Sequence, residues 1–387
     1  MANTFLTPNI IAREALMQLR ANCVMAGLVY RDYSSEFVAG VGDTVTIRKP
    51  ASFEAKEFNR ANGITIQDAT ESGVDVKLDK LLDVSFEVTA EQLTMDIADF
   101  STQLLQPAMQ SFAQKIDLYL LGLYSDIPYF DGTAGTTPST IAAITNVRQK
   151  LGENLAPLLL RRLVIDPAAE NSFLQLSTFH EADKVGDNGT ALREASLGRK
   201  FGFDIYSDQN VLTHTKGTLA VGGGTNPKIH PKAAGSVGDT ELTLNVSGGT
   251  SPTLTGTLKK GDYITIGTGT ATATYMITKD ATAATNEIDV EIAPALTADI
   301  ATTDEVTVGA SYTANLAFHR NAFALVSRPL ALPKGLADGQ KAVVNYDGFG
   351  LRVIYDYNSQ YKKDVVSIDM LCGVKTLDAR LACKMLG

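Results

Sequence analysis

The sequence predicts an α+β fold that is interrupted by a separate all-β unit. Three observations support this prediction. Apolar residues recur at helical spacing through residues 89–124, and alternating apolar residues mark strands on both sides of that stretch. Between residues 222 and 311 the composition changes to mostly Thr, Ala, Gly, Val and Ile. With 387 residues, of which 44% are hydrophobic, the chain is long enough for two or three domains.

Composition excludes several classes of protein. A net charge of -9 argues against a protein that coats nucleic acid through bulk positive charge. Cys23, Cys372 and Cys383 are odd in number and lack metal-ligand spacing, which favours a reducing compartment or buried free thiols. No signal peptide is recognisable, and no apolar run approaches the roughly 20 residues of a membrane span. We therefore expect a soluble, unsecreted protein.

The chain begins with an expected amphipathic helix. Thr7 is a suitable N-cap, Pro8 suits the first helical position, and apolar residues follow at near-helical spacing as far as Cys23. The apolar stripe is narrow. It fits docking on the chain's own domain or on a neighbouring subunit, and the sequence does not decide between them.

A long hairpin is expected next. Residues 43–48 alternate as a half-buried strand, and residues 74–88 alternate in the same way. The segment between them is polar and mixed in charge, with few large apolar residues. Such a segment cannot bury itself, so it is either a mobile loop or an arm that another molecule holds.

The organising element is a long amphipathic helix over residues 89–124. Thr89 and Gln92 are placed to form a capping box at its start. Pro107 lies inside the pattern, so we expect a kink or two helices that meet there. The apolar stripe consists of Leu93, Ile97, Phe100, Leu104, Ala108, Phe112, Ile116, Leu120 and Leu123.

An α/β region follows the long helix. After the flexible connection at residues 131–138, the pattern predicts alternating helices and strands. A second hydrophobic pattern resumes at Leu316, beyond the all-β unit. The expected helices cover residues 140–151 and 168–179, and the expected strands cover residues 158–166, 201–207, 316–330, 351–357 and 365–371.

Residues 222–311 are expected to form an inserted barrel or sandwich. Short alternating runs are separated by Gly, Pro and Asp turns, and Leu258–Asp262 reads as the turn that enters one strand. Gly222–Gly224 reads as a hinge into this unit, since no helix signal follows that would favour a phosphate site. Because the earlier pattern resumes afterwards, the unit is an insertion.

The search for catalytic chemistry finds no site. The phosphate-loop, zinc-helix, nucleophile-elbow and dinucleotide motifs are missing from the sequence. Asp204 and Asp208 are a candidate carboxylate pair, but two acids at this spacing are usually solvated. We expect no enzyme, no metal and no cofactor. The four histidines have no second ligand at metal-binding spacing: His180, His214, His230 and His319.

The order of these parts resembles the major capsid (coat) proteins of tailed bacteriophages, the Hong Kong 97 fold. More narrowly, it is similar to the branch with an insertion domain, such as the coat protein of the short-tailed phage P-twenty-two. The stretches that carry the resemblance are Phe201–Tyr206 with Leu212-Thr213, Leu258–Asp262, and Phe318–Leu330.

The resemblance implies a division of the chain. It implies an N-terminal arm, an extended loop, a spine helix in a peripheral domain, an axial domain and an inserted β domain. The corresponding residues are 1–42 for the arm, 43–88 for the loop, 89–126 for the spine helix, 127–221 for the first part of the axial domain, 222–311 for the insertion, and 312–387 for the remaining axial and peripheral strands.

The resemblance also implies a function, which is a shell of hexamers and pentamers around the phage genome. It implies a homo-oligomer in the virion, assembled in the bacterial cytoplasm with a scaffolding protein and a portal, and in some cases a decoration protein. DNA is enclosed without sequence-specific binding. A nanocompartment shell and a β-domain binding or adhesion module are the alternatives. The candidate inter-subunit contacts in the extended loop are Arg48, Lys49, Glu54, Lys56, Glu57, Arg60, Asp68 and Glu71.

Overall fold

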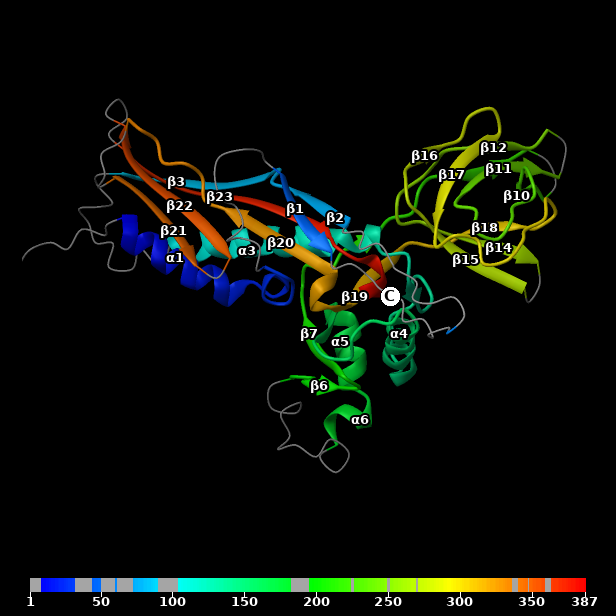
Figure 1. Ribbon diagram of the computed structural model, residues 1–387, viewed down its shortest axis with the longest axis horizontal. Coiled ribbons are helices and arrows are strands. Elements are labelled where there is room, and N and C mark those ends of the chain that lie inside the picture. The colour runs from blue at the N-terminus through cyan, green and yellow to red at the C-terminus, as the bar shows by residue number, and fades with distance from the viewer. Residues whose placement is uncertain are drawn as a thin grey trace, which may run out of the picture. The chain divides into compact units, whose positions relative to one another are not determined.

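The structure is a computed structural model that forms two compact units (Figure 1). The first unit comprises Met1–Ile116 and Phe323–Leu377, and the second comprises Asp117–Ala322 and Asp378–Gly387. The structure describes residues 8–31, 44–49, 60, 72–89, 104–181, 195–223, 226–248, 251–268, 271–335, 340–346, 348–358 and 363–387.

A five-stranded antiparallel sheet forms the centre of the first unit. Strand β23 pairs with β20, β22 and β3, so one long strand connects three others. Every second residue of β23 from Val366 to Cys372 is fully buried, which is the alternation expected of a strand with one face on a core. The strands are β3 (Lys80–Thr89), β20 (Phe323–Arg328), β21 (Lys341–Tyr346), β22 (Phe349–Asn358) and β23 (Lys363–Thr376).

The N-terminal helix α1 (Pro8–Asn22) packs on β21 and β22 of its own unit. Pro8 occupies the first helical position, as the sequence predicts. Ile11, Leu16 and Leu19 are buried, whereas Met17 on the opposite face is 70% exposed. Of the two docking modes left open by the sequence, this helix adopts the one within its own domain.

The hairpin is shorter than predicted. Strands β1 (Thr44–Lys49) and β2 (Ser72–Lys77) pair antiparallel, and Ile47 and Val76 point into a small core. Strand β3 then leaves the hairpin and pairs with β23. The sequence predicts a single arm as far as Val88, because the alternation continues almost unbroken across Leu78 and Asp79.

Helix α3 (Gln106–Leu121) is the described part of the long predicted helix. Pro107 lies in its first turn, where a missing amide costs no helical hydrogen bond, and a π turn at Leu104-Leu105 precedes it. The predicted apolar stripe is confirmed here, since Phe112, Ile116 and Leu120 are buried. A 3-10 helix, η4 (Gly122–Asp126), completes the segment. The predicted capping residue Gln92 lies outside the described residues.

The second unit contains a mixed seven-stranded sheet. Its order is β4-β24-β19-β5-β7-β6, with β8 paired to β19. The pairs β5–β7 and β24–β4 are parallel and the others are antiparallel. The strands are β4 (Phe130–Asp131), β5 (Arg161–Ile165), β6 (Arg199–Lys200), β7 (Phe203–Ser207), β8 (Thr213–His214), β19 (Tyr312–His319) and β24 (Ala382–Leu386).

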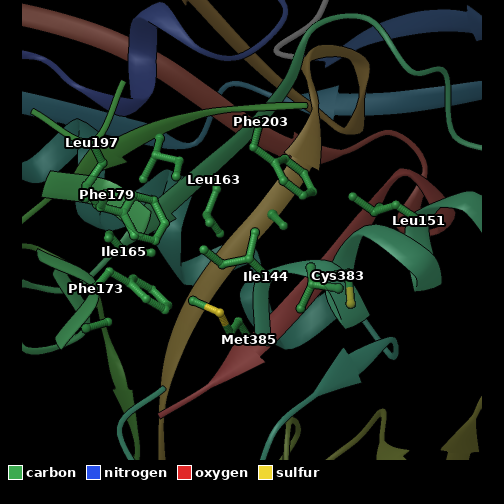
Figure 2. Packing of buried hydrophobic residues seen from close by; sticks show 14 of the residues in the cluster. Ile144, Leu151, Leu163, Ile165, Phe173, Phe179, Leu197, Phe203, Cys383 and Met385 are labelled. Atoms are coloured by element: carbon green, nitrogen blue, oxygen red, sulfur yellow. The ribbon is translucent and has the colours of Figure 1, made fainter. Parts of the chain in front are cut away.

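Three helices accompany the mixed sheet: α4 (Ile141–Glu153), α5 (Pro167–Leu174) and α6 (Ser177–His180). Asp166 caps α5 by accepting from the amides of Ala168 and Ala169 at 3.2 and 3.4 Å. Figure 2 shows the core of this region, where helix residues such as Ile144 and Phe173 pack with Leu163 of β5 and Met385 of β24.

Two predicted strand starts in this sheet are wrong, and the strand expected over residues 316–330 is divided into β19 and β20 by a 3-10 helix, η5 (Arg320–Ala322). Strand β5 begins at Arg161 instead of Leu158, and the three leucines before it are exposed. Strand β7 begins at Phe203 instead of Phe201, because Phe201 and Gly202 form a turn with φ of 51° and 83°. An apolar residue in a turn is indistinguishable from one in a strand when only hydrophobicity is read.

The inserted unit is a closed six-stranded barrel (Figure 1), one of the two architectures predicted. The two ends of the inserted segment lie side by side, because Thr213 of β8 pairs with Thr313 of β19 and His214 of β8 pairs with Tyr312 of β19. Gly222 ends a short strand, β9 (Ala220–Gly222), so the β-structure begins before the predicted hinge. In barrel order the strands are β10 (Lys228–Pro231), β11 (Glu241–Ser247), β17 (Glu287–Ala293), β15 (Ala271–Ile277), β14 (Tyr263–Thr268) and β18 (Val306–Val308).

Candidate functional site

The eight predicted contact residues of the extended loop remain predictions. Arg48 and Lys49 lie on β1, in register with Gly73 and Ser72 of β2. Arg60 is exposed in a turn. The other five lie outside the residues that the structure describes: Glu54, Lys56, Glu57, Asp68 and Glu71.

The described residues instead reveal a buried polar cluster where the barrel joins the mixed sheet. We call it the joint. Tyr124 comes from η4, His214 from β8, Tyr312 from β19 and Lys384 from β24. The barrel contributes the turn at Leu258–Asp262, together with Tyr263 of β14 and Met276 of β15.

His214 and Asp262 form the central contact of the joint. His214 Nε2 lies 2.8 Å from Asp262 Oδ1, and both residues are almost completely buried. A carboxylate only accepts, so Nε2 donates to Asp262, and Nδ1 lies 2.9 Å from the Tyr124 hydroxyl. The imidazole is thereby held in place between a carboxylate and a phenol.

Backbone amides complete the surroundings of the Asp262 carboxylate. Lys259 N donates to it at 2.8 Å and Gly217 N at 3.0 Å. Burial acts to raise the pKa of Asp262, but the hydrogen bonds from His214, Lys259 and Gly217 outweigh it and lower the pKa. The carboxylate therefore stays ionised and holds both sides of the joint together.

Gly261 allows the turn to approach the sheet closely. Its carbonyl accepts from the Tyr312 hydroxyl at 2.8 Å, and its φ is 101°, a conformation that favours glycine. A Cβ at this position would lie 3.1 Å from His214 Cε1. The adjacent Lys260 forms an ion pair with Asp126, which links the barrel to η4.

Lys384 is enclosed in the joint with no exposed surface. Its Nζ lies 3.2 Å from Met276 Sδ and 3.4 Å from the Tyr312 hydroxyl. The ring centres of Tyr263, Tyr312 and Tyr124 are 4.8, 5.6 and 5.8 Å away. Among the described residues no carboxylate forms an ion pair with it. Burial lowers the pKa of Lys384 to about 7.

The joint is a structural device and not a reaction centre. A lysine with a lowered pKa is a frequent sign of catalysis. Here the amine, the imidazole and the carboxylate are all closed to solvent, so no substrate reaches them. Their partners come from both the barrel and the sheet, and the cluster therefore fixes the orientation of one on the other.

The remaining polar candidates have separate structural partners. Asp204 lies 3.6 Å from Arg199, while buried Asp208 accepts from Asn210, so the two acids do not act as a pair. His230 Nδ1 contacts the carbonyl of Asp304. His319 accepts from the Asn321 amide, and burial with nearby arginines lowers its pKa.

A hollow of about 560 Å³ lies on the barrel surface, and Glu241, Asp280, Asp289 and Glu291 are among the residues that line it. Lys279 and Glu291 pair with one another in it, and Thr243 donates to Asp289 at 2.7 Å. Within the described part of the chain, no group of three or more His, Cys, Asp or Glu residues is suited to a metal ion. Among the same residues, no helix is long and apolar enough to span a bilayer.

Sequence reasoning missed most of the joint. Tyr124, Tyr312 and Lys384 lie far apart in the sequence, and each has an ordinary reading as a core or surface residue. One signal was present. The residue types of Leu258–Asp262 predict a turn, and its Gly261 and Asp262 both contact residues of the mixed sheet.

Comparisons with known proteins give distant structural similarities. No family model and no curated protein matches the chain. The chain is similar to a structure from Mycobacterium phage Che8, with 16% identity, 94% and 90% of the two chains covered and a TM-score of 0.48. The chain is 11% identical to a protein of the mature capsid of bacteriophage PhiM1, with 88% of this chain and 81% of that chain covered and a TM-score of 0.44. It is 9% identical to a virus-like particle protein from Pyrococcus furiosus, with 97% of each chain covered and a TM-score of 0.42.

Proposed function

We propose that the chain is a major capsid protein with the Hong Kong 97 fold, which assembles as hexamers and pentamers into an icosahedral shell around a phage genome. The order of parts is the observation that carries this proposal. Among the described residues, a docked N-terminal helix, a hairpin, helix α3, an α/β body and a barrel follow one another along the chain, an order that supports the resemblance. The barrel also interrupts the body between strands that pair with each other.

The organisation of polar groups supports a structural role. At the joint, His214, Asp262 and Tyr312 are buried and hydrogen-bonded to partners within the protein, so these groups stabilise the fold instead of converting a substrate. A shell subunit needs this rigidity, since heterologous contacts close into rings only when every copy presents its surfaces in the same geometry.

Within this proposal the parts have distinct roles. The hairpin of β1 and β2 reaches over an adjacent subunit, and the mixed charges between residues 48 and 75 fix the register of that contact. The α/β region lies around the axes of the capsomers. The inserted barrel steadies its own subunit, a role supported by the contacts of His214, Tyr312 and Lys384 with barrel residues.

Assembly also implies partners. We expect a separate scaffolding protein and a portal, and a decoration protein is compatible with the fold. DNA is enclosed without sequence-specific contacts, which agrees with a subunit of net charge -9. The mature protein would be found in the virion after assembly in the bacterial cytoplasm.

Negative-stain electron microscopy together with size-exclusion light scattering tests the proposal. The full-length protein is purified with and without a co-expressed scaffolding candidate. Closed shells, or rings of five and six subunits, are the expected result. A monomer or dimer under all conditions contradicts the proposal, and a glycan-binding screen of the full-length chain then tests the binding-module alternative. Shells that copurify with a protein cargo and no nucleic acid would indicate a nanocompartment.

A further inference from the structure

An exposed run of leucines precedes β5. We call residues 155–160 the leucine loop, and it connects α4 to β5. Leu155, Leu158, Leu159 and Leu160 are 88%, 67%, 71% and 48% exposed. Single exposed leucines are common on soluble proteins, but four within six residues are unusual, and apolar exposure clustered in this way normally marks an interaction site.

The leucine loop is held firmly by the body of the protein. Arg161 is 3% exposed, and its guanidinium donates to the carbonyls of Pro157 at 2.8 Å and Ala156 at 2.6 Å. Ala156 is itself buried in the core of the α/β region. The amide of Arg320 donates to the carbonyl of Leu160 at 3.3 Å. A buried arginine thus fixes the loop from beneath while the leucines point outward.

The backbone of the leucine loop is also strained at both ends. Leu155 and Leu160 have φ values of 58° and 57°, a left-handed conformation that is unfavourable for a residue with a branched side chain. Glycine or asparagine would relieve this strain. Strain that is maintained by surrounding hydrogen bonds, at a site that also exposes apolar surface, is typical of functional positions.

We propose that the leucine loop is a contact surface for a second copy of this chain. This inference rests on the proposed shell-forming function and assigns a specific contact to it. In a heterologous ring every copy uses the same surface once, so even a small apolar contact is repeated around the axis and adds to the stability of the ring. A preformed loop loses little conformational entropy when it binds.

Charge favours a copy of this chain over other occupants. Arg148, Arg162 and Arg320 lie near the leucine loop. Arg148 is close enough to Arg161 to help lower its pKa, and Arg162 has the same effect on the pKa of His319. An apolar surface with a basic surround fits an acidic partner, and this chain carries 43 acidic against 34 basic side chains.

A lipid surface fits the leucine loop less well. Arg161, the cation nearest the leucines in sequence, is turned inward to backbone carbonyls and is closed to head groups. The loop also has no aromatic residue, whereas interfacial segments commonly carry Trp, Tyr or Phe.

Site-specific photo-crosslinking of the full-length chain tests the proposal. A photo-reactive benzoyl-phenylalanine replaces Leu159, and the matched control carries it at Val237, which is 63% exposed on the inserted segment. Irradiation is done at high protein concentration, with and without vesicles of phosphatidylglycerol and phosphatidylcholine. The expected product at position 159 is an adduct of two copies, at several times the yield of the control. Adducts with lipid only, or a yield equal to that of the control, would overturn the proposal.

A paired variant separates this inference from the proposed function. Leu158→Ser with Leu159→Ser removes two exposed leucines, and circular dichroism is expected to show an unchanged fold. If the wild type forms shells and this variant forms at least tenfold fewer, both proposals are supported. If both form shells equally, the leucine-loop contact is wrong and the shell function stands. If neither forms shells, the shell function fails, and the yield of the position-159 adduct still decides whether copies meet at the leucine loop.

Discussion

His214 and Asp262 are 48 positions apart in the sequence, yet their side chains meet at 2.8 Å inside the protein. One residue ends the strand from which the barrel departs, and the other lies in the turn that enters a barrel strand. The contact therefore links the turn before β14 to β8, the strand that precedes the inserted segment.

Replacement of Asp262 by asparagine should destabilise the protein strongly. The variant loses the ionised acceptor of His214 and of two backbone amides, and breaking such a buried network costs about 3 kcal/mol or more. Urea unfolding measures the change. Asp204→Asn is the control, because its ion pair with Arg199 is exposed and its loss is expected to change the free energy of unfolding by about 0.5 kcal/mol at most.

Gly261→Ala should destabilise the protein more than Gly238→Ala. Both glycines have φ near 100°, with values of 101° and 100°, so an alanine is strained equally at either position. A Cβ at position 261 meets the His214 ring at 3.1 Å, whereas at position 238 no atom lies within 4 Å. The difference in melting temperature between the two variants isolates the close contact at the joint. Equal melting temperatures would show that the turn does not press on His214.

Lys384 should make stability depend on pH. In the folded protein its pKa falls from 10.5 to about 7, so between these values the unfolded state binds more protons. The free energy of unfolding therefore rises with pH across this window, and the cost of the buried charge is fully present below about pH 7.

Lys384→Met should flatten this dependence between pH 7 and pH 9 and stabilise the protein near pH 6 by roughly 2 to 5 kcal/mol. Urea unfolding at several pH values compares it with wild type, and Lys279→Met serves as the control because Lys279 is 71% exposed. Curves for Lys384→Met and wild type that run parallel across the window would show that the Lys384 amine is already charged in the fold.

The cysteines should differ in reactivity. Burial raises the pKa of Cys372 to about 12 and raises that of Cys383 further, so neither forms the reactive thiolate at pH 8. Cys23 is only half-buried. Mass spectrometry after brief iodoacetamide treatment should find label on Cys23 alone, and treatment in urea should label all three. Rapid native labelling of Cys383 would mean that β24 opens.

Elements with a regular pattern were predictable from the sequence. The all-β character of the inserted unit, the helix α1 and the stripe from Ala108 to Leu120 were confirmed within the described residues, because burial on one face imposes a period of 2 or 3.6 on the side chains. Boundaries were less predictable. The hydrophobicity of Leu158 to Leu160 predicts a buried strand, since hydrophobicity alone does not distinguish a core strand from an exposed apolar loop.

The joint could not be predicted, for a different physical reason. Tyr124, Tyr312 and Lys384 form a cluster only when three distant parts of the chain fold together, and no local spacing records that meeting. Only Gly261 and Asp262 left a local trace, because a turn with positive φ and a capping carboxylate needs specific residue types.

The pairing of Thr213 with Thr313 and of His214 with Tyr312 has a consequence for how such chains diversify. The main chain departs and returns through adjacent positions of one ladder, so the body needs no rearrangement to host whatever lies between them. The barrel is in this sense a cassette. A different compact module with neighbouring termini could occupy the same position in the chain. It would need residues equivalent to Gly261 and Asp262, which contact the mixed sheet.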